Sequence, residues 1–485
     1  MYNMRILMVD IDTLRPDHMG CYGYFRDTTP NIDSVAAEGV RFDQYYCPDA
    51  PCLPSRSALL SGRFGIKTGV VGHGGTTADK RIIGRDREFC SQDDENNLFN
   101  IFRKKGLYTA SISTFAERHS AWWFNAGFHE MHNVGGGGME SGETVLPVAL
   151  DWLDRKGADD NWFLHLHLWD PHTPYRAPAD FGNPFEDKPF TDWVDEIVFK
   201  QHLKKTGPHG LWELRMFDDA ENAAYPRMPG KVTEYAGLRR VFDGYDTGIR
   251  YADSLVGRVF DRMRQLGIFD DCAIIITSDH GETMGEFGIY CEHGVADEAT
   301  CHIPMIIKWP GAGAGQTDAQ FHYNLDLAPT MADLLDIRAY EKWDGKSYAQ
   351  TLRGGKGGGW DSLVLSQMAH VCQRSARFEN WLYIRTYHDG FHLFDKEMLF
   401  NIAEDPHEQH DVKERYPEVC ARGAKIILDW HDEQMLGSES QVDPLWTVVH
   451  ENGPYHTWGM LDAYLERLEA TGRHDGAQSL RKKYR

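Results

Sequence analysis

The 485-residue sequence lacks paired cysteines, a long apolar run and a recognisable leader. Its nine cysteines are odd in number and scattered without C-x-x-C pairs, so neither a disulfide framework nor a zinc module is indicated. No stretch approaches the roughly eighteen apolar residues of a membrane-spanning helix. "MYNMRILMVD", the first ten residues, has no apolar core and no small-residue cleavage site, so no signal peptide is visible. We therefore expect a cytoplasmic protein, or a periplasmic or secreted one if a leader has been removed.

The sequence also lacks an excess of positive charge. Lys and Arg number 51 against 73 Asp and Glu, which gives a formal net charge of −22. Because a general nucleic-acid surface needs a basic patch that releases counterions, this balance argues against nucleic acid as a partner. An anionic substrate must be attracted by a local cluster of Arg, His or metal ion. The length favours two domains.

Predicted strands and helices alternate over the first three quarters of the sequence. Short apolar runs predict buried strands at 5–11, 107–113, 162–169 and 272–281. Helical patterns between them include 29–42 and 248–267. This alternation predicts an α/β fold with a large, mainly parallel sheet flanked by helices. Residues 178–235, rich in Pro, Trp and acids, are predicted to form a loop-rich insertion that shapes a pocket.

The stretch "LRGGKGGGW" (352–360) is the clearest change in composition. Since Gly-rich breaks mark loops, we place a domain boundary here, with a catalytic domain at 1–355 and a smaller C-terminal α+β domain at 356–485. Short strand-like pieces at 362–369, 381–388 and 391–396 predict a small antiparallel sheet in the second domain, followed by helices.

Two groups of polar residues follow predicted strands. Asp10 and Asp12 lie two residues apart at the end of the first strand, so both carboxylates face the same side. Asp279 and His280 follow the apolar run "CAIIIT". Strand ends of one α/β sheet meet at one crevice, and neighbouring carboxylates repel unless a cation or proton lies between them. The pattern indicates a divalent-metal site, with solvated strand-end acids as the alternative.

The segment "PCLPSRSALLSGR" places a cysteine between two prolines, which stiffen the turn. A helix is expected to follow, with Ser55 as its N-cap and Gly62 at its end. A helix N-terminus binds anions and lowers the pKa of a thiol, and Arg56 adds positive charge. Because hard divalent ions prefer oxygen to sulfur, we expect position 52 to carry oxygen in the mature protein.

This segment resembles the signature of the type I, formylglycine-dependent sulfatases of the alkaline phosphatase superfamily, C-x-P-S-R-x-x-L-x-[ST]-G-R. Five further stretches resemble motifs of that family, in its order: "ILMVDIDTLRPDHMGCYGY", "DPHTPY", "TSDHGE", "HIPMIIKWPG" and "FHLFDKEMLFNIAEDPHEQHDV". The sequence is therefore identified as a member of this family. The resemblance implies the superfamily's fold and an enzyme that hydrolyses a sulfate ester to inorganic sulfate and an alcohol.

The resemblance also implies a metal site. One divalent cation, calcium in most of the family with Mn²⁺ or Mg²⁺ as alternatives, would be held by Asp12, Cys52 as formylglycine, Asp279 and His280. The family often has two adjacent acids where this chain has Asp12 and Thr13. Whether Asp10 compensates as a further ligand stays open.

Catalytic roles follow in the same way. A maturase would convert Cys52 to formylglycine, whose hydrate would attack sulfur while Arg56 orients it. His172, in "DPHTPY", would contact the sulfate or protonate the leaving alcohol.

At two positions the chain departs from the family pattern. Many sulfatases have a lysine after the strand at 107–113, where the nearest residues here are Arg118 and His119. A second family lysine is replaced by His293, which we expect to serve the leaving group or the substrate anion.

Three alternatives stay open. The first is a phosphonate monoester or phosphodiester hydrolase of the same fold, because a less charged substrate needs less compensation. The second is a binding protein that keeps Cys52 unmodified, and the third is a zinc hydrolase without formylglycine. The resemblance leaves the substrate unnamed, either a small molecule or a saccharide sulfate ester. A homo-oligomer is one outcome for the assembly, and no membrane partner is indicated.

Overall fold

The computed structural model describes residues 4–80, 92–438, 440 and 442–485. At its centre is an eight-stranded sheet, and β1 runs parallel to both of its neighbours. In spatial order the strands are β11 (Gln316–Tyr323), β2 (Val40–Tyr46), β10 (Met305–Lys308), β7 (Ala273–Thr277), β1 (Arg5–Ile11), β6 (Trp162–Leu168), β4 (Tyr108–Ile112) and β5 (Glu130–His132). β10 is antiparallel to β2 and β7. The prediction of a mainly parallel α/β sheet is confirmed.

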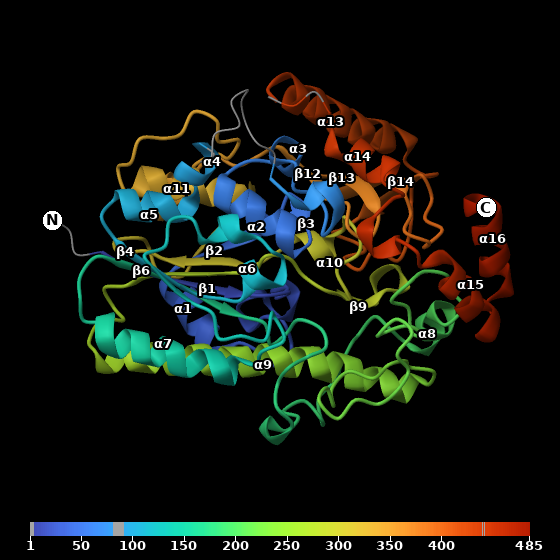
Figure 1. Ribbon diagram of the computed structural model, residues 1–485, viewed down its shortest axis with the longest axis horizontal. Helices are drawn as coiled ribbons and strands as arrows, with labels where there is room; N and C mark the ends of the chain where they lie inside the picture. The colour runs from blue at the N-terminus through green and yellow to red at the C-terminus, as the bar shows by residue number, and fades with distance from the viewer. Residues whose placement is uncertain (1–3, 81–91, 439, 441) are drawn as a thin grey trace.

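Helices cover both faces of this sheet (Figure 1). Successive residues of a strand point to opposite faces, and β1 supplies both cores. Leu7 and Val9 pack in the core formed with α1 (Pro30–Glu38), α7 (Gly142–Lys156) and α9 (Tyr235–Gln265). Ile6 and Met8 pack in the core formed with α2 (Cys52–Ser61), α5 (Leu98–Lys104) and α11 (Leu327–Leu334). Asp10 and Asp12 continue the second series, so their side chains face α2.

Two predicted helices differ from those observed. The helix expected at 29–42 ends at Glu38, and residues 40–42 begin β2. Gly39 allows this change because β10 passes close by: a Cβ there would lie 2.6 Å from the carbonyl oxygen of Ile307. The helix expected at 248–267 is only the C-terminal part of α9, which has 31 residues and begins at Tyr235.

A second sheet of five strands contains the predicted C-terminal strands. Its order is β15 (Glu397–Asn401), β14 (Trp381–His388), β13 (Cys372–Phe378), β12 (Ser362–Gln367) and β3 (Asp49–Ala50). The pieces at 362–369 and 381–388 are strands, whereas 391–396 is not, and β13 and β15 were missed. β13 was not predicted because it contains buried polar residues whose hydrogen-bond partners are distant in the sequence. Arg374, for example, donates two hydrogen bonds of 2.7 and 2.8 Å to Asp443.

β3 comes from the segment just before α2 and pairs in parallel with β12. Residues 40–50, just before Cys52, therefore carry β2 of the large sheet and β3 of the second sheet. The domain boundary near residue 355 stays a prediction. Four helices complete the C-terminal part: α13 (Pro417–Leu436), α14 (Pro444–His450), α15 (Leu461–Ala470) and α16 (His474–Tyr484).

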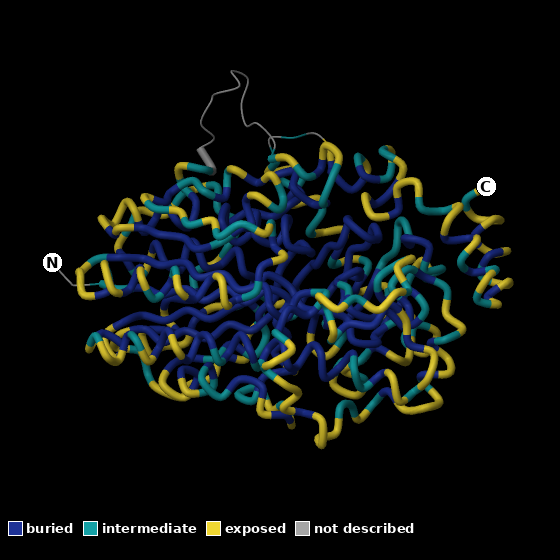
Figure 2. The backbone as a smooth tube through the Cα atoms, turned by 60° about the horizontal axis from the view of Figure 1, so that its bottom comes forward, coloured by how far each residue is buried: buried dark blue, intermediate teal, exposed yellow. Residues whose placement is uncertain are grey.

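The burial pattern follows this layering. In Figure 2 the chain is buried through the middle of the molecule and exposed mainly at peripheral turns and helix surfaces. Within the described residues, no helix has both the length and the apolar character needed to cross a membrane. The eight cysteines that the structure describes are all free thiols.

Candidate functional site

α2 begins where β1 and β7 end. Cys52 is the first residue of α2, it is 1% exposed, and its Sγ lies 3.0 Å from Nε2 of His280. Because the helix starts at Cys52, Ser55 is not its N-cap as predicted; the Ser55 hydroxyl instead donates to the carbonyl of Asp279. Gly62 ends the helix in the left-handed conformation (φ 66°), as predicted.

Four predicted metal ligands lie together. Ligand atoms of Asp12, Cys52, Asp279 and His280 all lie within 4.8 Å of one another, and all four residues are buried. Asp12 Oδ1 has no hydrogen-bond partner among the described residues, although it is buried. Since an unpaired buried carboxylate oxygen is costly, this atom fits a cation at the centre of the group. Two carboxylates and an imidazole suit a divalent ion, whereas the thiol at position 52 suits a hard ion poorly.

Arg56 lies behind this group and contacts three carboxylates. Its Nε and Nη2 each lie 3.1 Å from an oxygen of Asp10, and its Nη1 lies 3.0 Å from Asp12 Oδ2 and also binds Asp279. Burial alone would raise the pKa of Asp10 and Asp12, but the Arg56 guanidinium and neighbouring histidines hold both below the usual range. Burial raises the pKa of Asp279, which Arg56 only partly offsets.

Asp10 is bound differently from the other acids. Besides its two bonds to Arg56, its Oδ2 lies 3.5 Å from Nε2 of His165. It is not a member of the four-residue group around Cys52. The structure therefore gives Asp10 the position of a partner that fixes Arg56, and its role as a ligand stays a prediction.

Sequence reasoning missed two histidines on β6. His167 Nε2 lies 2.7 Å from Nη2 of Arg56, and His165 contacts Asp10. In the register of the sheet, Asp10 stands beside His167. The alternation in "HLHL" on a strand next to β1 was the available signal, because residues two apart share one face.

His172 and His293 form a second group with Cys52, in which all ligand atoms lie within 4.8 Å. The ring centroids of His172 and His293 are 5.5 Å apart, and those of His280 and His293 are 4.2 Å apart. Nδ1 of His172 donates to the carbonyl of Thr173 at 2.6 Å, which leaves Nε2 with the lone pair. Burial lowers the pKa of both His172 and His293 well below the usual value, so both rings are neutral near pH 7.

Two acids contact His293. Its Nε2 lies 3.0 Å from Glu292 Oε1, and its Nδ1 lies 3.7 Å from Glu282 Oε2. Burial and the charge of Glu292 raise the pKa of Glu282 well above the usual value. Nε2 of His293 therefore lies beside a carboxylate, whereas its Nδ1 has no hydrogen-bond partner among the described residues.

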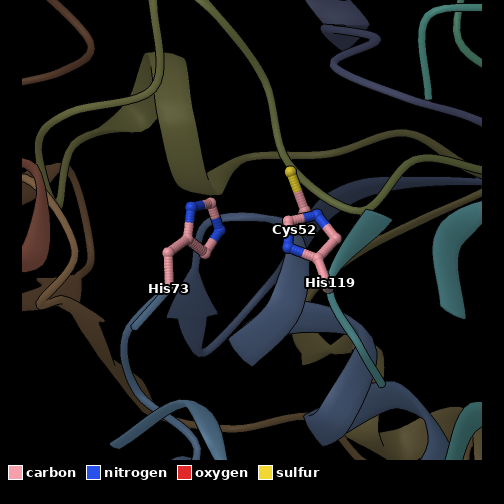
Figure 3. A group of neighbouring side chains, drawn as sticks. All are labelled: Cys52, His73 and His119. Carbon is pink, nitrogen blue, oxygen red and sulfur yellow. The ribbon is translucent and has the colours of Figure 1, made fainter. Parts of the chain in front are cut away.

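His119 and His73 complete the surroundings of Cys52 (Figure 3). Ligand atoms of the three residues lie within 4.8 Å of one another, and the two rings are 5.0 Å apart. Burial and the adjacent Arg118 lower the pKa of His119 to about 3. His73 therefore belongs to the group around Cys52, whereas Lys67, which follows the same segment, is paired with Asp344.

The electrostatics at Cys52 contradict one expectation. Its pKa is raised well above the usual thiol value, first by burial and then by the carboxylates of Asp12 and Asp279. These effects exceed the opposite effect of Arg56 and Arg118. The unmodified side chain is therefore a protonated thiol and a weak nucleophile.

Comparison with known proteins gives two family matches. The model of the family "Sulfatase" matches residues 5–337, and that of "N-sulphoglucosamine sulphohydrolase, C-terminal" matches residues 285–422. A choline-sulfatase of Rhizobium meliloti is 25% identical, with 94% of this chain and 93% of the relative covered. An N-acetylglucosamine-6-O-sulfatase of Bacteroides thetaiotaomicron is 23% identical over 84% of this chain and 82% of its own. A multifunctional alkaline phosphatase superfamily protein of Trinickia caryophylli is 26% identical over 68% and 73%.

Solved structures share the fold. One, a complex with the substrate D-glucosamine-2-N,6-O-disulfate, has a TM-score of 0.71 at 19% identity and covers 92% of this chain and 99% of its own. The phosphonate monoester hydrolase of Agrobacterium radiobacter has a TM-score of 0.66 at 19% identity, covering 89% and 96%. At these identities the likeness concerns the arrangement of strands and helices, and the chemistry rests on the side chains described above.

Proposed function

The chain belongs to the sulfatase family and is a sulfuric ester hydrolase, and we propose that it cleaves a sulfate ester with formylglycine at position 52 and one bound divalent cation. The observation that carries this proposal is the group of Asp12, Cys52, Asp279 and His280, with Arg56 directly behind it. A buried, protonated thiol has no evident chemistry in such a group. An oxygen-bearing residue 52 would provide both a metal ligand and a nucleophile.

The metal ligands and their chemistry can be stated from the donor set. Asp12, Asp279, His280 and the oxygen of residue 52 would hold the ion, with Ca²⁺ favoured over Mn²⁺ or Mg²⁺ because of the family resemblance. When bound, the cation would lower the pKa of a hydroxyl at position 52 and offset negative charge on the substrate. Asp12 Oδ1 is the buried oxygen that such an ion would satisfy.

The remaining steps belong to the chain's own groups. Converted residue 52 supplies a geminal diol, of which one hydroxyl can attack sulfur and the other can later expel the sulfate. Arg56 keeps the carboxylates in place and adds positive charge where the oxygens of the transferred group gather. His172 or His293, both within reach of residue 52, would take up the proton that the attacking hydroxyl loses and pass it to the leaving alcohol. Arg118 and His119, the residues nearest in sequence to the place of the missing lysine, would contact the anion in this proposal.

Two observations favour phosphonate monoester or phosphodiester hydrolysis as a second activity. The phosphonate monoester hydrolase has the same fold, and the relative from Trinickia caryophylli is named as multifunctional. The lysines that many sulfatases use are absent here, and a monoanionic phosphonate ester needs the same charge compensation as a sulfate ester.

For the leaving group we propose a saccharide or small alcohol. The glucosamine disulfate complex and the N-acetylglucosamine-6-O-sulfatase support a saccharide, and the choline-sulfatase supports a small cationic alcohol. Tyr455 and Trp458, 44% and 38% exposed with ring centroids 5.2 Å apart, flank His456, whose Nε2 lies 3.2 Å from Nδ1 of His73. Such rings suit stacking on a sugar face.

A substrate screen tests the proposal. Enzyme produced together with a formylglycine-generating maturase would be given sulfated sugars, aryl sulfates, choline sulfate and aryl phosphonate esters in parallel. We expect kcat/KM to be highest for one sulfate ester and to vanish with Cys52→Ala. A higher kcat/KM for the phosphonate esters would establish the second activity instead. Full activity without maturase would contradict the formylglycine mechanism, and no activity on any ester would favour a binding protein.

A further inference from the structure

A second group of ligand-type side chains lies beside His293 and supplies neither a ligand of the first metal site nor a proposed catalytic group. His209 comes from the insertion at 178–235, Glu292 ends β9 (Tyr290–Glu292), and His370 follows β12. Ligand atoms of these three residues, here called the His-Glu-His cluster, all lie within 4.8 Å of one another.

The separations within the cluster match those around a tetrahedral ion. His209 Nε2 lies 3.3 Å from Glu292 Oε2, and His370 Nε2 lies 3.5 Å from Glu292 Oε1. Zinc–nitrogen and zinc–oxygen bonds of ~2.0–2.1 Å at tetrahedral angles place ligand atoms roughly 3.3–3.4 Å apart. The carboxylate of Glu292 therefore lies between the two imidazoles, at distances from which all three side chains could bind one ion.

One ligand atom of the cluster is unsatisfied. His370 is 6% exposed, and its Nε2, directed at Glu292, is buried without a hydrogen-bond partner among the described residues. The ring of His370 stacks on that of His456 at 4.0 Å and 6°, which fixes its direction. A buried imidazole nitrogen that is held in place and unpaired costs stability unless a ligand or ion binds it.

The backbones that carry the cluster are tied to one another. The Tyr290 N–H donates to the carbonyl of His209 at 2.8 Å, which joins the insertion to β9. Gln367 links the other two parts: its side-chain amide donates to the carbonyl of His293 at 2.8 Å, and its Oε1 accepts from the N–H of His370 at 3.0 Å. These hydrogen bonds hold three segments that are distant in the sequence in fixed positions around Glu292, as a preorganised site requires.

We propose that His209, Glu292 and His370 bind one transition-metal dication, with Zn²⁺ as the expected ion, at a second site separate from that of Asp12 and Asp279. Two imidazoles and one carboxylate are a zinc-type donor set, and they leave a fourth position for water or a substrate group. A bound dication would also add positive charge next to His293.

The protonation of the cluster agrees with this assignment. Burial, and then the charges of His456 and His209, lower the pKa of His370 well below the usual value. A neutral imidazole is the form that binds a metal, so no proton has to be displaced from His370 near neutral pH.

Zinc binding by the full chain tests the proposal without reference to turnover. We would use Cys52→Ala as the background, which removes the thiol, and saturate the first site with excess Ca²⁺. Equilibrium dialysis against Zn²⁺, read by elemental analysis, should show one zinc per chain. Co²⁺ in place of Zn²⁺ should give the visible absorption bands of a four-coordinate imidazole site.

Variants then locate the ion. We expect His370→Ala and Glu292→Gln to lower zinc affinity more than about 100-fold, since even outer partners of metal ligands are worth 10–100-fold. Glu292→Gln keeps the side-chain shape, and circular dichroism checks the fold of each variant. His410→Ala is the matched control, because His410 is a surface histidine 3.5 Å from the carboxylate of Asp405, and it should bind zinc normally. Absence of bound zinc, or equal binding by Glu292→Gln and His410→Ala, would overturn the proposal.

Discussion

The Arg56 guanidinium donates two parallel hydrogen bonds to the Asp10 carboxylate, from Nε and from Nη2, each of 3.1 Å. This geometry is the strong, bidentate form of an ion pair, and both partners are buried. Asp12 and Asp279 each share Arg56 but also face Cys52 and His280. The acids therefore divide into one that positions Arg56 and two that are placed to bind an ion.

From this division we predict that substitutions of the three acids differ in their effect on metal content. Asp12→Asn should lose the divalent ion and activity together, and Asp279→Asn should do the same. Asp10→Asn should keep the ion but lower kcat by about 10–100-fold, because a misplaced Arg56 no longer meets the reacting group. The measurement compares metal content, by elemental analysis, with kcat in the same preparation of each variant. If Asp10→Asn lost its metal as fully as Asp12→Asn, Asp10 would be a ligand after all.

A second prediction concerns the leaving group. His293→Ala should lower kcat/KM by about 100-fold or more for an alkyl or sugar sulfate, whose alkoxide needs a proton. The loss should be much smaller for 4-nitrophenyl sulfate, whose phenolate leaves without one. The measurement is kcat/KM for both esters over a range of pH, with His172→Ala assayed in parallel and His410→Ala as the surface control.

The two histidines would then be told apart by their leaving-group dependence. If His293→Ala left both the rate and the pH profile unchanged, its assignment to the leaving group would be wrong. A strong dependence in His172→Ala alone would transfer that role to His172, whose Nε2 can take up a proton and pass it on.

Local patterns explain which parts of the site the sequence could predict. Asp12 and Asp279 stand at the ends of apolar runs, and the motif around Cys52 is contiguous, so strand-end reasoning and the family resemblance located them. His165 and His167 lie within an equally apolar run and become visible only when β6 is placed beside β1. His209 and His370 could not be found in this way, because they are 161 positions apart and Gln367 and Tyr290 bring them together through the tertiary fold.

The fold shows the same limit. Apolar runs located β1, β4, β6 and β7 of the large sheet, since both faces of that sheet are buried, but they did not locate β2, β5 or β11. They also failed at β13, where Arg374 and Arg377 are buried through ion pairs with Asp443 and Glu298, and such partners are not readable from spacing. The predicted helix at 29–42 also extended beyond its observed end at Glu38. The close approach of β10 to Gly39 is a property of the packed sheet and could not be seen in the sequence.

A third prediction concerns pH and stability. Glu286 is buried and lies 3.0 Å from Arg15; burial opposes its ionisation, but Arg15 and His407 lower its pKa from 4.5 to about 2. A depressed folded-state pKa stabilises the fold above the unfolded value, and this contribution is lost as pH falls from about 4.5 toward 2. Glu286→Gln should therefore lower the free energy of unfolding near neutral pH by roughly 3 kcal/mol.

Thermal unfolding of the variant and of wild type over a pH series provides the measurement. The difference between their midpoints should be largest near neutral pH and should narrow below about pH 4.5, where Glu286 begins to take up a proton in the unfolded chain. Glu414→Gln, which changes an exposed acid, is the control. A difference that stays constant down to the lowest pH would mean that Glu286 acts through packing and not through its charge.

The last prediction concerns Cys52 itself, which we expect to be formylglycine in the active enzyme. The side chain is 1% exposed at the start of α2, so a maturase cannot reach it in the folded protein. Conversion must therefore precede folding, when the segment around 50–63 is still extended. A synthetic peptide of these residues should be converted in vitro, whereas the folded, unmodified enzyme should resist conversion under the same conditions.

Peptide mass spectrometry of active enzyme should show the loss of sulfur at position 52 and an aldehyde that reacts with hydrazides. Cys52→Ala should be inactive, and Cys52→Ser should be inactive where no serine-converting maturase is present. Full activity from protein whose residue 52 is an intact thiol would refute the mechanism, because that thiol is protonated and offers no oxygen to a metal.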